Sequence, residues 1–225
     1  MMSHTEKALR DGVSALELQL DDNAIQKLLD YPSLIGKWTQ VYNLTAVRDP
    51  TEMLTHHLLD SLAIISPLQR HLANTNRIAK ASLLDVGSGA GLPGVVIAIC
   101  CPAVQVTCVD AVAKKVAFIK QASLALNLPN LTGLHARVET IAQPFDIVCS
   151  RAFASLPDFV KWSQKALSPT GVWMAMKGKH PKEECAALPP LVDVFHVEQL
   201  RVPGLDAQRC LLWMRPTLRR AEAIT

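Results

Sequence analysis

Before residue 81 the apolar positions have helical spacing, and after it short apolar runs alternate with helical segments. Over residues 21–44 the apolar side chains recur every three or four positions, which predicts an amphipathic helix. Asp21 and Asp22 stand where the N-cap of that helix is expected. Pro32 lies inside the pattern and should kink or split the helix, because proline has no backbone N–H to donate.

A second helix is predicted over residues 49–65, again from helical spacing of apolar positions. Asp49 precedes Pro50, which combines a good capping residue with a good first-turn residue. We therefore expect residues 1–80 to form a helical N-terminal extension.

After residue 81, short apolar runs alternate with helical segments. The predicted strands are 82–87, 105–110, 131–136, 145–150 and 171–178, and the predicted helices are 92–101, 111–127 and 155–167. This repetition predicts an α/β domain over residues 81–225, in which a mostly parallel sheet is covered by helices on both faces.

Two further strand-like runs, 191–202 and 209–216, complete a seven-stranded sheet. The link between them is short, whereas a parallel crossover needs about a dozen residues or more. We therefore expect them to pair antiparallel, so that the last strand of the sheet runs against the others.

Composition limits the classes of protein to be considered. The chain has 225 residues and 49% hydrophobic content, enough for one main core with an appendage. No apolar run reaches the roughly 18 residues that span a bilayer, and no signal segment precedes the first helix, so we expect a soluble, cytoplasmic protein without membrane contact. The six cysteines show no C-x-x-C pairing, which predicts buried thiols and no metal site.

Glycines follow the first predicted strand at close spacing and suggest a nucleotide-type ligand. Residues 89–94, Gly-Ala-Gly-Leu-Pro-Gly, match G-x-G-x-x-G, and Asp110 ends the next strand, where an acid binds ribose hydroxyls. That pattern alone fits either a dinucleotide or S-adenosylmethionine. Asp85 decides between them, because its carboxylate would repel a pyrophosphate but attract the ammonium of the methionine part. We expect S-adenosylmethionine, with Gly87 and Gly89 allowing its close approach.

Four motifs in one order carry a resemblance to a known family. They are NLTAVRDPTEMLTHHLLDSL, LLDVGSGAGLPG, HARVE and IVCSRAFASL, and they extend from about Trp38 to Leu156. The chain resembles the glucose-inhibited division protein B family, the bacterial 16S ribosomal RNA guanine-N7 methyltransferases. The resemblance implies a Rossmann-like, S-adenosylmethionine-dependent fold. It also implies that Gly87, Leu92, Val138, Glu139 and Arg151 hold the methyl donor.

The chemistry implied by this resemblance needs no general base, since guanine N7 carries a free lone pair. Arg151 is then the candidate catalytic residue, at the end of a strand where ligands bind in an open α/β sheet. Cys149 could be a nucleophile for cytosine methylation, but it lies in an apolar run and is expected to be a buried thiol. A methyltransferase acting on a small molecule or a protein stays open, as does a donor-binding protein without catalysis. A nicotinamide oxidoreductase is disfavoured because only about fifty residues follow the predicted strand 171–178, too few for a catalytic domain.

A net charge of only +3 means that contacts with 16S ribosomal RNA must come from a local patch. The loop cations that we expect there are Arg48, Lys177, Lys179 and Arg209. His56 and His57 are adjacent on a helix and cannot form the i, i+4 pair of a metal site. We expect a monomer that acts on ribosomal RNA, either free or within the small ribosomal subunit.

Overall fold

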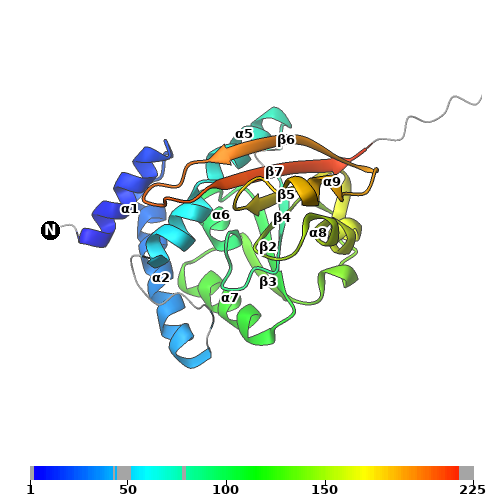
Figure 1. Cartoon of the computed structure of the whole chain (residues 1–225). Helices are drawn as coiled ribbons and strands as arrows, with labels where there is room; N and C mark the ends of the chain where they lie inside the picture. Colours follow the sequence, from blue (N-terminus) through cyan, green and yellow to red (C-terminus); the bar gives the residue numbers. More distant parts are fainter. Residues whose placement is uncertain (1–2, 43, 45–51, 78–79, 218–225) are drawn as a thin grey trace, which may run out of the picture.

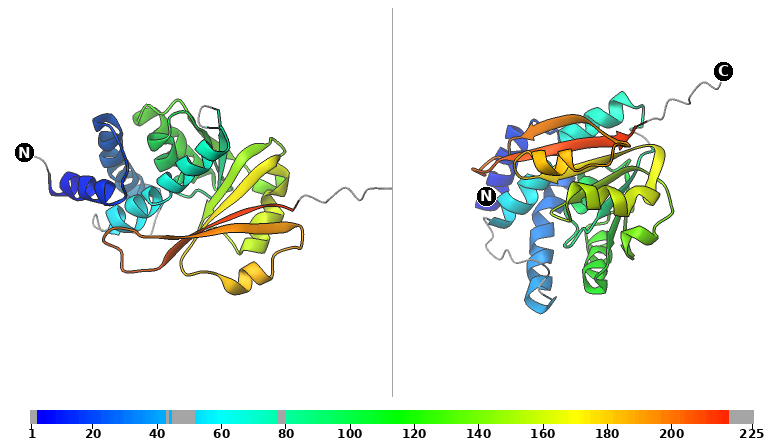
Figure 2. Two further views of the ribbon diagram at one scale, coloured as in Figure 1. Left: turned by 90° about the horizontal axis from the view of Figure 1, so that it is seen from above. Right: turned by 45° about the vertical axis from the view of Figure 1, so that its right-hand side comes forward.

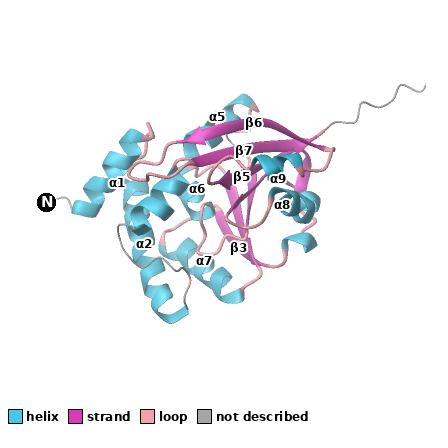
Figure 3. Cartoon of the chain, in the orientation of Figure 1, coloured by secondary structure: helices cyan, strands magenta, loops and turns pink. Residues whose placement is uncertain are grey.

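The computed structural model describes residues 3–42, 44, 52–77 and 80–217. These residues form a seven-stranded sheet with the order β3-β2-β1-β4-β5-β7-β6. The strands are β1 (Ser82–Val86), β2 (Gln105–Asp110), β3 (Leu131–His135), β4 (Phe145–Arg151), β5 (Leu167–Lys177), β6 (Val192–Leu200) and β7 (Arg209–Pro216). Figure 3 shows this sheet at the centre of the molecule with helices around it.

The first five strands pair in parallel, and β7 pairs antiparallel with both β5 and β6. The predicted mostly parallel sheet with an antiparallel last strand is therefore confirmed. Figure 2 shows β6 and β7 as a long curved hairpin. The short connection between these two strands allows only this antiparallel return.

The central strands of the sheet are buried on both faces, which explains their continuous apolar runs. Consecutive residues belong to opposite apolar clusters: Leu83 and Met174 lie on one face, and Leu84 and Ala175 on the other. The helices α6 (Gly94–Cys100) and α7 (Ala113–Ala125) pack on the first face, and α8 (Leu156–Ser163) packs on the second. Figure 1 shows α7 and α8 on different sides of the strands.

The N-terminal helices α1 (His4–Ala15) and α2 (Asp22–Tyr42) add a further layer outside α6 and α7. Asp21 is the cap of α2, since its Oδ1 accepts a hydrogen bond of 2.7 Å from the backbone N–H of Ala24. Of the kink or split predicted at Pro32, the split is wrong: α2 is one continuous helix through this residue. Neighbouring Tyr31 and Ile35 are fully buried, so packing on both sides of the proline holds the helix together.

The segment predicted as one helix over residues 49–65 is helical but not uniformly wound. Asp49 and Pro50 lie outside the described residues. Met53–Leu59 form the π-helix η1, followed by the α-helical turn α4 (Asp60–Leu62) and by α5 (Ile65–Asn74). None of the helices that the structure describes is long and apolar enough to cross a membrane.

Short helical turns complete the fold. These are the 3₁₀ turns η2 (Val138–Thr140) and η3 (Gln164–Ala166) and the helix α9 (Lys182–Ala186). The predicted helix 155–167 thus ends as a 3₁₀ turn, and α9 was not predicted. Its five residues are too few to show an apolar period.

Candidate methyl-donor site

The turn after β1 uses three glycines in the left-handed region. Gly87, Gly89 and Gly91 have φ angles of 67°, 59° and 87°. At Gly87 a Cβ atom would also lie 2.2 Å from the ring of Phe153. Only glycine fits this position, both because of its backbone angle and because an aromatic ring lies directly over it. The backbone of the turn therefore lies close to the groups beside it, such as the Phe153 ring.

Asp85 lies behind this turn and is fully buried, with 0% of its surface exposed. Its Oδ2 accepts a hydrogen bond of 2.9 Å from the N–H of Gly94, the first residue of α6. The thiols of Cys108 and Cys149 donate to its two oxygens at 3.8 and 3.7 Å. Burial raises the pKa of Asp85 to about 6. The carboxylate thus supports the turn from below and does not form part of a cavity wall.

Asp110 connects the end of β2 to the glycine turn. Its Oδ2 accepts a hydrogen bond of 3.0 Å from the N–H of Gly89, and its Oδ1 accepts one of 2.8 Å from the N–H of Val112. Lys115 Nζ lies 3.7 Å from Oδ2. The N-cap position of α7 belongs to Val112, so Asp110 is not the cap of that helix.

A cavity of about 460 Å³ opens at the carboxyl ends of the parallel strands. It is lined by Val86, Gly87, Val109, Asp110, Ala111, Lys115, Ala136, Arg137, Val138, Glu139, Ala152, Phe153 and Trp162. Ligands of open α/β sheets bind at this edge. The structure therefore brings together four residues predicted from the sequence: Gly87, Asp110, Val138 and Glu139.

Other predicted donor residues lie beside the cavity and not on its wall. Leu92 is buried in the core below the turn, and its peptide bond to Pro93 is cis. Gly89 is on the turn and donates to Asp110. Arg151 ends β4, directly before the lining residues Ala152 and Phe153.

The aromatic wall of the cavity was missed in the sequence. The rings of Phe153 and Trp162 meet edge to face, with their centroids 5.8 Å apart. Ala152, which precedes Phe153, has a φ of 52°, an angle that is uncommon for a residue other than glycine. Phe153, two residues after the end of β4, could have been noticed in the sequence. Trp162 reaches the cavity from α8, and no local sequence pattern indicates this.

Arg151 is held by contacts with η1 and α4. Its Nη1 donates to Asp60 Oδ2 at 2.9 Å and to the carbonyl of His56 at 3.0 Å. Its Nη2 lies 3.4 Å from His57 Nδ1. Burial, together with the charge of Arg151, lowers the pKa of His57, which favours the neutral imidazole. Sequence reasoning missed Asp60, the buried carboxylate on which this arrangement depends.

Three of the four cations predicted to contact RNA are in the described part of the chain: Lys177 ends β5, Arg209 begins the adjoining strand β7, and Lys179 follows β5 by two residues. Arg48 lies outside the described residues. Lys177 donates to the carbonyl of Ala154 at 2.9 Å and pairs with Glu184 at 2.8 Å. Arg209 Nε donates to Asp60 Oδ1 at 2.7 Å, and Lys179 is exposed. Lys177 and Arg209 therefore carry internal ion pairs as well as positive charge.

Cys149 is fully buried between the strands and donates to Asp85. Burial raises the pKa of its thiol well above the ordinary value. A nucleophilic thiol needs exposure and a low pKa, so the expectation that Cys149 is a structural residue is confirmed.

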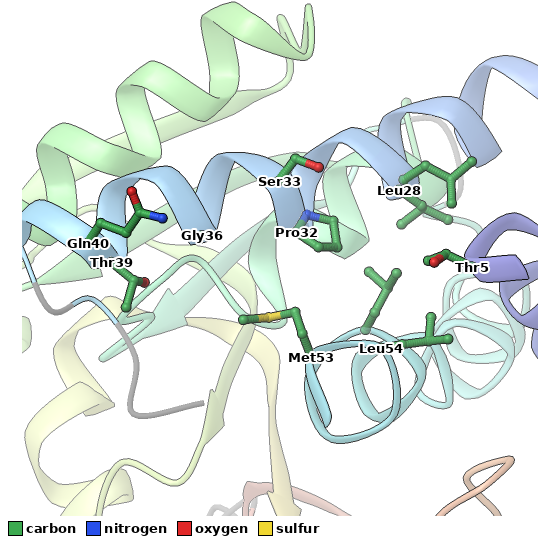
Figure 4. A pocket seen from close by; sticks show the side chains of 11 residues that line it. Thr5, Leu28, Pro32, Ser33, Gly36, Thr39, Gln40, Met53 and Leu54 are labelled. Carbon is green, nitrogen blue, oxygen red and sulfur yellow. The ribbon is translucent and has the colours of Figure 1, made fainter. Parts of the chain in front are cut away.

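A larger cavity of about 630 Å³ lies between α1, α2 and η1. Figure 4 shows Pro32 and Thr39 on α2 facing Met53 and Leu54 of η1 across this space. Among the described residues that line it there is no charged side chain and no residue of the glycine turn. It therefore lacks the groups that a charged methyl donor requires.

Comparison with known proteins agrees with this arrangement. Residues 24–212 match the family described as rRNA small subunit methyltransferase G. The chain is 71% identical over 210 residues to ribosomal RNA small subunit methyltransferase G of Polaromonas sp., with 93% of each chain covered. It is 67% identical to the protein of that name from Polaromonas naphthalenivorans, with 96% of this chain and 99% of the relative covered.

Two solved structures share the fold of this chain at low sequence identity. The N-methyltransferase NodS from Bradyrhizobium japonicum, solved with S-adenosyl-L-homocysteine, has a TM-score of 0.57 at 14% identity and covers 83% of this chain and 97% of its own. TrmN from Thermus thermophilus has a TM-score of 0.53 at 19% identity, over 66% of this chain and 47% of its own. Together they confirm the Rossmann-like methyltransferase fold.

Proposed function

Because this chain belongs to the rRNA small subunit methyltransferase G family, we propose that it transfers a methyl group from S-adenosylmethionine to N7 of a guanosine in 16S ribosomal RNA. The observation that carries the donor assignment is the cavity at the ends of β1 to β4, where the glycine turn, Asp110 and the Val138-Glu139 pair converge. The family carries the substrate assignment.

The residues of the cavity fit this donor. Asp110 offers an acidic acceptor for the paired ribose hydroxyls, which are hydrogen-bond donors. Val138 and Glu139 line the cavity together with Phe153 and Trp162, and we propose that they border the adenine. Gly87 lines the same cavity, and because it has no side chain, Phe153 can pack against the turn beside the space proposed for the methionine part. We propose that Arg151 borders the reacting end of the donor.

The beginning of α6 argues against a dinucleotide. A pyrophosphate binds where the N–H groups of a helix N-terminus are available. Here the first N–H, that of Gly94, already donates to Asp85, and the next residue upstream is Pro93, which has none. Asp85 adds negative potential at the same place when it is ionised, which favours a cationic ligand.

The proposed methyl transfer does not require a general base in the protein. When bound, the donor supplies a methyl group on a sulfonium centre, and the N7 lone pair can accept it without losing a proton. The residues around the cavity therefore act by positioning the reactants and excluding water. The neutral state favoured for His57 agrees with this, since an imidazolium beside Arg151 would add a repulsive charge.

The experiment combines purified protein, labelled S-adenosylmethionine and ribosomal RNA from a strain that lacks the enzyme, offered both as free 16S RNA and as assembled small subunits. Nucleoside mass spectrometry should find labelled 7-methylguanosine. Label in another nucleoside would overturn the assignment to N7. Label only in protein or in a small molecule would favour the alternative substrate class. Comparing the two substrates in the same assay also shows whether the protein acts on free RNA or on the assembled subunit.

A further inference from the structure

Asp60 contacts two arginines that are far away in the sequence. Its Oδ2 accepts from Arg151 at 2.9 Å and its Oδ1 accepts from Arg209 at 2.7 Å, so each oxygen serves one guanidinium. Asp60 is 3% exposed. A carboxylate that is this deeply buried requires compensation by charge, and both arginines supply it.

The two arginines lie on the same edge of the sheet as the donor cavity. Arg151 ends β4 and pairs in register with Met176 of β5. Met176 pairs in turn with Leu211 of β7, two residues after Arg209. Because β7 is antiparallel, its first residue lies beside the carboxyl end of β5. The two ion pairs therefore connect α4 to β4 and to β7, the two strands on either side of β5, just outside the cavity.

The cluster keeps an unsatisfied positive charge. Two guanidinium groups and one carboxylate sum to one net positive charge, and the side chains of Arg151 and Arg209 remain 17% and 24% exposed. Within the described part of the chain, Arg209 Nη2 and Arg151 Nε have no hydrogen-bond partner. Lys177, at the same strand ends, is neutralised by Glu184. Arg151 and Arg209 therefore contribute one positive charge to this edge that Asp60 does not balance.

We infer that Asp60 is a positioning residue that fixes Arg151 at the donor cavity and Arg209 toward a phosphate of the substrate RNA. This inference rests on the proposed function. One rigid carboxylate thereby sets the distance between the group that borders the donor and the group that binds the RNA backbone. Its position after the π-helix η1 matches this role, because π-helical turns concentrate at functional sites.

The test compares D60N and R209Q with a matched control. The control, D146N, weakens the ion pair of Asp146 with Arg77 and its hydrogen bonds to Ser82, at the opposite end of the sheet. Donor affinity is measured by calorimetry, methylation by kcat and KM for RNA, and RNA binding as a function of salt concentration. Melting temperature reports any general loss of stability in each variant.

We expect D60N to lower kcat/KM for RNA by about tenfold or more, the factor that 1.4 kcal/mol represents, and to weaken donor binding several-fold. R209Q should raise the KM for RNA and make the salt dependence of RNA binding shallower by about one phosphate contact, with donor affinity unchanged. D146N should lower the melting temperature alone. The double variant D60N/R209Q should have nearly the KM of D60N, because both changes act through Arg209.

Kinetics of D60N equal to those of D146N would overturn the inference, as would a loss of donor affinity without any change in the KM for RNA. If D60N does not fold, an unchanged salt dependence in R209Q overturns it. An inactive wild-type protein would instead contradict the proposed function. In that case unchanged donor affinity in D60N would still overturn the inference.

Discussion

The hydroxyl of Tyr31 on α2 donates a hydrogen bond to the carbonyl of Ala90, in the middle of the glycine turn. Tyr31 is fully buried and packs against Phe118 of α7, with ring centroids 6.3 Å apart. The Cβ position of Gly91 lies 3.1 Å from the same hydroxyl. The N-terminal extension is thus attached directly to the turn that shapes the donor site.

We predict that Y31F destabilises the protein by about 1–2 kcal/mol, because it leaves a buried carbonyl without its partner. It should also weaken donor binding several-fold, since the turn becomes less restrained. Urea unfolding and calorimetry measure the two effects. S123A is the control: Ser123 Oγ donates to the carbonyls of Leu128 and Leu131 at the far end of α7, so this change should cost stability and leave donor affinity intact.

The raised pKa of Asp85 predicts an unusual dependence of stability on pH. Because its pKa rises from 3.8 to about 6 on folding, the folded protein keeps a proton that the unfolded chain has released between these values. The contribution of Asp85 to stability is therefore complete below about pH 4 and is lost as the pH rises through about 6, with a total of about 3 kcal/mol.

D85N imitates the protonated form and should lack this loss. The unfolding free energy of D85N relative to the wild type should therefore increase between pH 4 and pH 7, as measured by urea unfolding at several pH values. Parallel curves for the two proteins would contradict the assignment of the raised pKa to Asp85.

The fold was accessible from the sequence because its signals are local. Each central strand is buried on both faces, so its apolar run shows in the sequence without knowledge of its neighbours. The ends of the elements were predicted less accurately: β5 begins at Leu167, whereas the predicted strand begins at residue 171. The helix predicted to split at Pro32 is continuous. The burial of Tyr31 and Ile35, a tertiary effect, outweighs one missing backbone donor.

The site could be predicted only in part, because some of its residues follow local sequence patterns and others do not. Gly87 and Asp110 follow strand ends, and the sheet brings strand ends together. Asp60 lies 91 residues from Arg151 and 149 from Arg209, so no spacing rule connects these three side chains. The π-helical winding of η1, which ends next to Asp60, has no local pattern in the sequence that would distinguish it from an α-helix.

Gly87 is crowded and Gly36 has open space around its Cβ position, so alanine should have opposite effects at the two sites. G87A combines a left-handed backbone angle with a Cβ atom 2.2 Å from Phe153, and should destabilise the protein by at least about 1–3 kcal/mol and abolish donor binding. Gly36 is inside α2 with nothing within 4 Å of its Cβ position, so G36A should stabilise the protein by about 0.5–1 kcal/mol. Thermal unfolding and donor titration of both variants test this contrast. Equal behaviour of the two would contradict it.

Variants at Asp110 and at Arg48 should affect different properties: the former donor binding, the latter methylation of RNA. D110A removes the acceptor proposed for the ribose hydroxyls and releases the N–H groups of Gly89 and Val112, so it should weaken donor binding tenfold or more. D110N keeps one acceptor for those N–H groups and should have an intermediate affinity. R48A, at a predicted RNA contact, should bind the donor normally and methylate RNA more slowly. Calorimetry with S-adenosyl-L-homocysteine and the methylation assay measure the two properties independently, and normal donor binding by D110A would place the donor elsewhere.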